Sequence, residues 1–290
     1  MFDIPGFVWL QSIVNGLVLG WVYVLMALGL SLILSITRIL QFAHGEVYML
    51  GAYVAYYFSV VLGLNFILSI FLSVLLMVVL GLLLERFLFR PLQAEFLPSM
   101  VVALGLMIII QSSVTLGFGL IPKSIPSFAP GSFGIFGIKI GMDRVVAVGV
   151  SIAFTLLLFL FIKKSKYGLA LAAAPQHREA SILQGISPNA MSALALAIGS
   201  GLAAVGGALM GATLVLNTYM GSTALIKGLI IIVLGGMGSL LGVVVGGLIM
   251  GLVDGVVLVI FGSVAASVAP LVLVIIILIF KPSGLFGHEF

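Results

Sequence analysis

The sequence predicts an all-α fold, a polytopic bundle of transmembrane helices, from three observations. Of the 290 residues, 63% are hydrophobic and 7% are charged, whereas a soluble domain carries roughly 25% charged residues. The mean hydropathy is +1.42. Uncharged segments recur along the chain at 4–37, 47–84, 96–122, 145–162, 180–226, 228–253 and 255–280. Because a spanning helix needs about 20 apolar residues, these segments predict eight or nine crossings, some of them broken or re-entrant.

The same composition excludes several other classes of protein. A transmembrane β-barrel would alternate polar and apolar residues, and these segments do not. The chain has no cysteine, so it has neither disulfides nor thiol chemistry. Its net charge of +4 is modest and in a membrane protein reports loop orientation, so we expect no nucleic-acid partner. The N-terminus has no basic region followed by a small-residue cleavage site. Residues 4–37 are therefore predicted to be a retained helix rather than a signal peptide.

The first half of the chain predicts one long helix and then a helical hairpin. The first apolar segment ends at Arg38, and residues 47–84 fold back at a turn formed by residues 63–65. Glu46 and Glu85, at the two ends of this hairpin, are therefore expected on one side. The basic residues expected on that side are Arg38, Arg86 and Arg90. Basic short loops mark the cytoplasmic side, which places the N-terminus outside.

The middle of the chain predicts an outward crossing, an external loop and a return. Residues 96–122 lead to a loop at 119–142 that is rich in Gly, Pro and Ser and is expected to be irregular. A further helix is predicted to start at Pro188 with Ser187 as its N-cap. Small residues at four-residue spacing allow close helix packing in lipid. In this helix they are Gly199, Ala203, Gly207 and Gly211.

The C-terminal region leaves two topologies open. If GGMGS at 235–239 is a cytoplasmic turn, Lys281 lies inside after nine crossings. If residues 228–253 form one span, the number is eight and Lys281 lies outside. Because Lys281 is basic, the positive-inside rule favours nine.

The longest hydrophilic break is a polar island at residues 163–188. It holds four of the chain's 12 Lys and Arg residues, namely Lys163, Lys164, Lys166 and Arg178. Pro175 can begin a helix and Gly185 can end it, which predicts about ten residues and roughly 15 Å. Such a helix is too short to cross and lies at the cytoplasmic surface. It is either a connector, solvated or bound to anionic lipid, or a lever that a soluble partner grips.

A second polar group comprises Gln41, His44 and Glu46, with Gly45 between them. Ionisable residues at membrane depth are costly and face a cavity or one another. A broken helix here would direct free backbone N–H groups at a substrate carboxylate. Alternatively, His44 and Glu46 pair at the cytoplasmic mouth and position two helices. Isolated polar residues that either line a path or bond between helices are Asn15, Gln111, Asn217, Lys227 and Asp254.

No catalytic or metal-binding grouping is visible, so the chain is not expected to be an enzyme. The three histidines, His44, His177 and His288, have no intramembrane partner that spacing supports. The phosphate-cradling pattern GxxxxGK[ST] is missing. The chain is therefore not expected to hydrolyse ATP itself.

Several motifs resemble one family. Arg178-Glu179-Ala180-Ser181, followed by Gly185, resembles the Glu-Ala-Ala…Gly coupling loop of ABC importer permeases. QFAHGEVYMLGAY at 41–53, ERFLFRPL at 85–92, VLGGMGSLLGVVVGGLIMG at 233–251 and FKPSGLFG at 280–287 are similar to segments of permeases for branched-chain amino acids. The chain departs from that pattern at three places. Gln41 stands where the family usually has Asn, and Ala172 stands where many relatives have Arg. Residues 175–177 replace a more usual Ala-Gln-Asp.

The resemblance implies a permease subunit of an ATP-driven importer for branched-chain or similar amino acids, multi-pass in a bacterial-type inner (plasma) membrane. It implies one permease domain over 1–290 with a cytoplasmic coupling loop at 163–188. The implied partners are ABC ATPase subunits, a second permease, an extracytoplasmic substrate-binding protein and a small-molecule substrate. No cofactor is expected in this chain, since ATP binds the ATPases.

The implied site residues fall into two groups. The coupling residues are Arg178, Glu179, Ala180, Ser181 and Gly185. The residues of the translocation path are Gln41, His44, Gly45, Glu46 and Asn217. The alternatives are an ABC permease for urea or amides and a secondary transporter or channel for a small polar solute.

Overall fold

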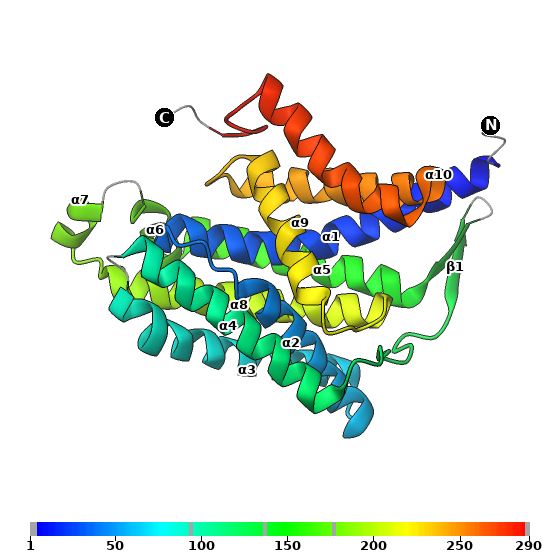
Figure 1. The fold of residues 1–290 in the computed structure, drawn as a ribbon, viewed down its shortest axis with the longest axis horizontal. Coiled ribbons are helices and arrows are strands. Elements are labelled where there is room, and N and C mark those ends of the chain that lie inside the picture. The colour runs from blue at the N-terminus through cyan, green and yellow to red at the C-terminus, as the bar shows by residue number, and fades with distance from the viewer. Residues whose placement is uncertain (1–4, 93–94, 136–137, 176–177, 288–290) are drawn as a thin grey trace.

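Long helices packed side by side make up the bundle (Figure 1). The structure is a computed structural model and describes residues 5–92, 95–135, 138–175 and 178–287. The long helices are α1 (Gly6–Thr37), α3 (Phe66–Leu84), α4 (Phe96–Phe118), α5 (Met142–Lys164), α8 (Pro188–Thr213) and α10 (Leu240–Phe280). In the described residues, six helices are long and apolar enough to cross a membrane. The protein is therefore a multi-pass, helical membrane protein, as predicted.

Two shorter helices begin inside the bundle. They are α2 (His44–Tyr56), which continues through a π-helical turn at Tyr57–Val61, and α9 (Met220–Gly235). After α1, the chain returns from the end of the bundle to its middle before α2 starts (Figure 1). The α9 helix likewise starts near the middle and runs obliquely to the start of α10. The polar side chains at the start of α2, among them His44 and Glu46, are thus carried into the interior.

Helix α10 turns back on itself. It spans 41 residues, and Gly262 inside it has φ +79°, a left-handed conformation that favours glycine. Figure 1 shows the first half of α10 running beside α1 and the second half returning at an angle. Pro270 lies within the returning half. The long apolar segment is therefore a helical hairpin rather than one straight helix.

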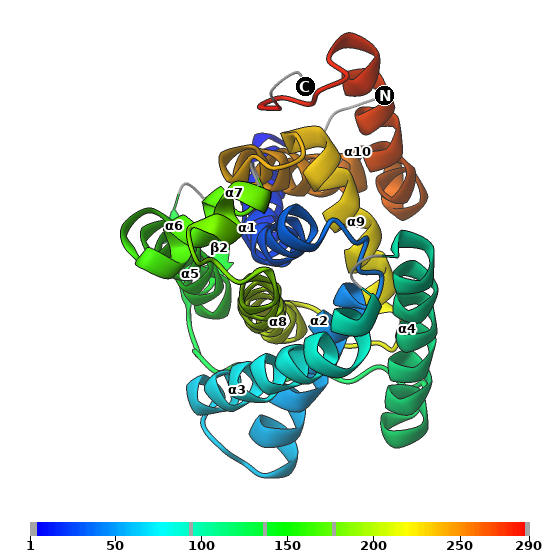
Figure 2. The same cartoon turned by 90° about the vertical axis from the view of Figure 1, so that its left-hand side faces the viewer.

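Helices α1 and α8 form the centre of the bundle (Figure 2). Within the most apolar part of each, 78% of the residues are buried, compared with 11% in α4 and 6% in α10. Glycines allow this packing: a Cβ added to Gly29 would lie 2.7 Å from the Gly199 carbonyl oxygen. Likewise, a Cβ on Gly16 would lie 2.7 Å from the Gly251 oxygen, so α1 touches α8 on one side and α10 on another.

The starts of α3 and α8 lie where the sequence predicted them, and GGMGS forms a turn, one of the two alternatives that the sequence left open. Asn65 caps α3 by accepting a hydrogen bond of 2.9 Å from the Ile67 N–H. Ser187 caps α8 by accepting one of 3.4 Å from the Ala190 N–H. In GGMGS, Gly236 and Gly238 have positive φ, and Ser239 then caps α10. Each turn combines a residue that tolerates the conformation with a side chain that satisfies a helix N-terminus.

Two segments differ from the prediction. The external loop contains a short antiparallel hairpin, β1 (Ser132–Ile135) and β2 (Ile138–Gly141), because its bulky apolar residues pair across the two strands. The polar island forms two short helices, α6 (Lys166–Ala173) and α7 (Arg178–Leu183), instead of one helix from Pro175. Helix α6 ends at Ala173, just before Pro175, because proline has no backbone N–H with which to continue the helical hydrogen bonds. Residues 176–177, part of the predicted helix, lie outside the described residues.

Candidate functional site

The start of α2 places polar side chains deep in the bundle. Gln41 is 3% exposed, and His44 and Glu46 are fully buried. His44 Nε2 lies 3.3 Å from the Met26 carbonyl oxygen of α1. Met26 lies 11 residues before Thr37, the last residue of α1. Eleven helical residues span about 16 Å along the helix axis. The expectation that His44 sits at the cytoplasmic mouth is therefore wrong, because residues 38–43 carry the chain back into the bundle.

His44 and Glu46 do not pair with each other. Within the described ranges, both Glu46 carboxylate oxygens, His44 Nδ1 and Gln41 Oε1 are buried without a hydrogen-bond partner. Buried polar groups almost always have a partner in the protein or in ordered water. The segment from Gln41 to Glu46 therefore holds several buried polar atoms that could still form hydrogen bonds, in an otherwise apolar bundle.

The starts of α2 and α9 meet at Gly45 and Gly221. A Cβ added to Gly221 would lie 2.7 Å from the Gly45 carbonyl oxygen and 2.5 Å from Glu46 Oε2. The Glu46 carboxyl group therefore lies against the first turn of both helices. Glycine is needed at both positions because any side chain would separate the two helices.

Asn217 does not join this buried cluster. Its side chain is exposed, and its Oδ1 accepts a hydrogen bond of 3.0 Å from the Tyr219 N–H. The Asn217 carbonyl also accepts from the Met220 N–H. Asn217 therefore shapes the loop that leads into α9.

A second polar cluster joins three helices and was not predicted as a unit. The Tyr23 hydroxyl of α1 donates to Asp254 Oδ2 of α10 at 2.9 Å. The Lys227 ammonium of α9 donates to the Tyr23 hydroxyl at 2.8 Å and forms an ion pair with Asp254. The sequence singled out Lys227 and Asp254 as isolated polar residues. The available signal was their opposite charge in adjacent apolar segments, since ionisable residues in membranes usually pair.

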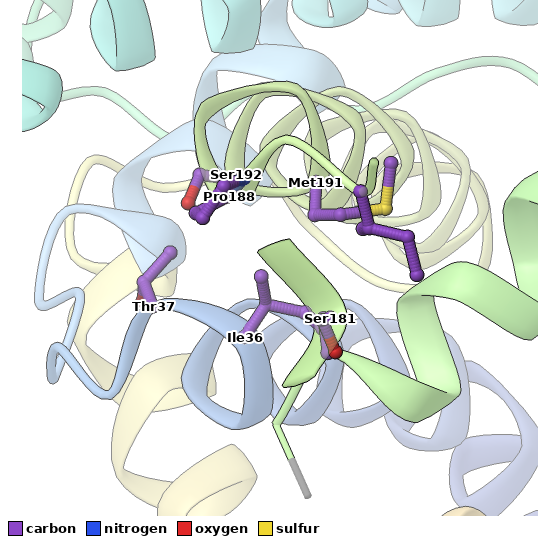
Figure 3. Close-up of a pocket in the computed structure, with 8 residues that line it drawn as sticks. Ile36, Thr37, Ser181, Pro188, Met191 and Ser192 are labelled. Carbon is purple, nitrogen blue, oxygen red and sulfur yellow. The ribbon is translucent and has the colours of Figure 1, made fainter. Parts of the chain in front are cut away.

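The island residues rest on the ends of α1 and α8. Figure 3 shows Ser181 of α7 beside Ile36 and Thr37 of α1 and Pro188, Met191 and Ser192 of α8. These residues line a small cavity of about 30 Å³. Gly185, with φ +79°, ends the segment after α7, and the Ile186 N–H donates back to the Ser181 carbonyl at 3.0 Å. Arg38 at the end of α1 also donates to the Pro175 carbonyl at 3.3 Å.

Helix α7 projects at one end of the molecule (Figure 1). Arg178, Glu179 and Ala180 form its first half, and their side chains lie outside what the structure describes. His177 and His288 also lie outside the described residues. Among the residues that are described, no group of three or more His, Asp or Glu side chains is arranged to hold a metal ion.

A family model described as "Branched-chain amino acid transport system / permease component" matches residues 12–280. The chain belongs to this family. It is 33% identical to the high-affinity branched-chain amino acid transport system permease protein BraD of Pseudomonas aeruginosa, over 97% of this chain and 96% of BraD. It is 31% identical to the corresponding protein LivH of Escherichia coli K12, over 96% of each. The resemblance predicted from the motifs is confirmed.

A solved structure shares the fold of this permease. PsaBC from Streptococcus pneumoniae in complex with Fab superposes with a TM-score of 0.50 at 16% sequence identity. The match covers 94% of this chain and 91% of that one. The family model, which spans residues 12–280, thus covers both polar clusters and α7.

Proposed function

We propose that this chain is the membrane-spanning permease subunit of an ATP-driven importer whose substrate is a branched-chain amino acid or one of similar chemistry. The observation that carries the proposal is the 33% identity to BraD over 97% of the chain. The chain provides the passage, as one permease domain with no cofactor of its own. ATP binds and is hydrolysed on partner ATPase subunits, since this sequence lacks a phosphate-cradling loop.

The proposed topology has nine crossings of a bacterial-type inner membrane. The two halves of α10 on either side of Gly262 each cross. Helices α2 and α9 each complete a crossing with the loop before them, at 38–43 and 214–219. The end that carries α7 is cytoplasmic by the positive-inside rule. The basic residues at the helix ends and loops there are Arg38, Arg86, Arg90, Lys163, Lys164, Lys166, Arg178 and Lys281.

Helix α7 is proposed to be the contact that the ATPase moves. Its proposed coupling residues are Arg178, Glu179, Ala180, Ser181 and Gly185. Ser181 packs on the ends of α1 and α8, the two central helices, so a displacement of α7 reaches the middle of the bundle. ATP binding would then bias two arrangements of these helices through a difference in affinity. A second permease and an extracytoplasmic binding protein complete the proposed complex.

The segment from Gln41 to Glu46 is proposed to border the translocation path, with Asn217 at the loop leading to it. Four buried polar atoms there have no partner among the described residues. Because such atoms are costly to leave unsatisfied, they favour a polar substrate or water beside them during transport.

Purification of the tagged chain from native membranes tests the proposed complex. We expect an ATPase, a second permease and a binding protein to co-purify. In proteoliposomes, the complex should take up leucine, isoleucine and valine only when ATP reaches the ATPase side. Recovery of the chain alone, with uptake driven by an ion gradient, would instead indicate a secondary transporter. Uptake of urea in preference to leucine would contradict the proposed substrate.

Replacement of Glu179 by alanine tests the coupling role. We expect an assembled complex whose leucine uptake falls at least tenfold relative to its ATP hydrolysis. The matched control is Glu95→Ala, which removes an exposed carboxylate just before α4, outside the island, and should leave uptake unchanged. Normal uptake by the Glu179→Ala variant, with the complex intact, would contradict the proposed coupling role of α7.

A further inference from the structure

An open cavity of about 450 Å³ lies between α1, α9 and the two halves of α10, and its lining residues Ile226 and Leu258 are 53% and 50% exposed. Much of its wall is apolar and includes Leu19, Ile226, Ile230, Leu258, Ala266 and Leu271. The Tyr23, Lys227 and Asp254 cluster lies in the same wall. Ligand sites are concave, mostly apolar, roughly 300–1,000 Å³ in volume and equipped with a few placed polar groups. The cavity has these properties.

The Lys227 ammonium is the accessible charge in this wall. The Lys227 side chain is 20% exposed, whereas that of Asp254 is 8% exposed. An ammonium has three donors, and in the described part of the chain Lys227 uses two of them, on Tyr23 and Asp254. One donor of a fixed cation thus remains for an anion that enters the cavity.

Two hydroxyls in the wall are set to accept hydrogen bonds. Thr223 Oγ1 donates to the Tyr219 carbonyl at 3.2 Å, and Ser267 Oγ donates to the Ser263 carbonyl at 3.0 Å. Both residues line the cavity. Because each hydroxyl hydrogen is used within its own helix, its remaining lone pairs can accept from a cationic donor.

A contribution to folding stability is a weak explanation for the presence of the buried Lys227–Asp254 ion pair. Taking two charges out of water costs several kcal/mol per ion, and replacing a buried pair by apolar residues is often neutral or stabilising. An ionisable pair inside a membrane segment is by default a functional site. The pair lies on the wall of a large cavity, which indicates what that function is.

We propose that this cavity is a binding subsite for a zwitterionic amino acid with an apolar side chain, an inference that rests on the proposed function. The Lys227 ammonium binds the ligand carboxylate. The Thr223 and Ser267 hydroxyls accept from the ligand ammonium, and the apolar wall holds the ligand side chain. Tyr23 and Asp254 are positioning residues, which hold the lysine side chain directed at the cavity.

The first test removes the ion pair without leaving a single buried charge. Lys227→Met/Asp254→Leu is compared with wild type in the complete complex, reconstituted in proteoliposomes. We expect the complex to assemble and its ATPase to respond to the loaded binding protein, while leucine uptake falls at least tenfold. The matched control is Glu85→Leu/Arg90→Met, which removes an ion pair outside the cavity and should retain uptake.

The outcomes separate this inference from the proposed function. If wild type takes up leucine with ATP and the double variant does so within twofold, the subsite is overturned and the importer stands. If the wild-type complex takes up no amino acid, the proposed function fails and this inference fails with it. A loss of uptake with normal ATPase stimulation supports the subsite, since a purely structural defect would lower both.

The second test changes the shape of the cavity and leaves the charges in place. Ala266→Phe should lower leucine uptake more than valine uptake, with the leucine-to-valine ratio falling at least threefold. Ala265→Phe is the control, because Ala265 precedes Ala266 in the chain and does not line the cavity. An unchanged ratio in an assembled Ala266→Phe complex would overturn the subsite.

Discussion

At the scale of single residues, His44 links the start of α2 to the central helix α1. Its ring is fully buried at the start of α2, and Nε2 lies 3.3 Å from the Met26 carbonyl of α1. His44→Ala should lower the free energy of unfolding by about 1–3 kcal/mol, because it removes this contact and leaves a void. Thermal unfolding of the purified protein in detergent measures the loss.

A second variant separates the hydrogen bond from the volume. In His44→Gln an amide N–H can replace Nε2 as the donor, so we expect a smaller loss of stability than in His44→Ala. If the two variants are equally destabilised, the bond to Met26 contributes nothing and packing explains the effect. If neither is destabilised while uptake falls, His44 acts on the path and not on helix position.

The polar residues show what a sequence can reveal at this scale. Lys227 and Asp254 stand out because each is a lone charge in an apolar segment, and that pattern is enough to single them out. Their partner Tyr23 does not stand out, because a tyrosine in a spanning helix is ordinary. Which side chains meet depends on how α1, α9 and α10 pack, and the sequence spacing does not specify that packing.

At the scale of helices, the contact between α2 and α9 depends on glycine. A Cβ on Gly45 would lie 2.8 Å from Leu225 Cβ and would overlap the Gly221 carbonyl oxygen. Gly45→Ala should therefore push the two helices apart and cost about 1–3 kcal/mol of stability, as overpacking does. We expect less folded protein in detergent and leucine uptake reduced at least tenfold.

Gly105→Ala in α4 is the matched control for Gly45→Ala. A Cβ at Gly105 has nothing within 4 Å, and alanine favours a helix more than glycine does. Folded yield and uptake should be retained. Equal damage from both substitutions would mean that Gly45 is needed for some property other than close approach to α9.

Helix ends were more predictable than helix paths. Asn65, Ser187 and the glycines of GGMGS mark turns because their preferences act locally, over a few residues. The path of residues 38–43 back into the bundle is set by the packing of α2 against both α8 and α9. For that reason the sequence placed His44 and Glu46 at a membrane surface. In the polar island, Pro175 was predicted to begin a helix, but it separates α6 from α7 instead.

At the scale of the whole molecule, the nine-crossing topology makes a direct prediction about access from each side. The chain contains no cysteine, so single cysteines can be introduced without removing others. Leu62, between α2 and α3, and Met237, in the turn between α9 and α10, are 52% and 64% exposed. Nine crossings place position 62 outside the membrane. They place position 237 and Tyr167, which lies in α6, on the cytoplasmic side.

Labelling with a membrane-impermeant maleimide distinguishes the two topologies. Leu62→Cys should react in intact cells, whereas Met237→Cys and Tyr167→Cys should react only after the membrane is permeabilised. With eight crossings, residues 228–253 form one span, and position 237 would be embedded and unreactive in both conditions. Reaction of Met237→Cys in intact cells would contradict both topologies. Because Tyr167→Cys lies in the polar island, its labelling also tests whether α6 and the adjacent α7 face the side on which an ATPase works.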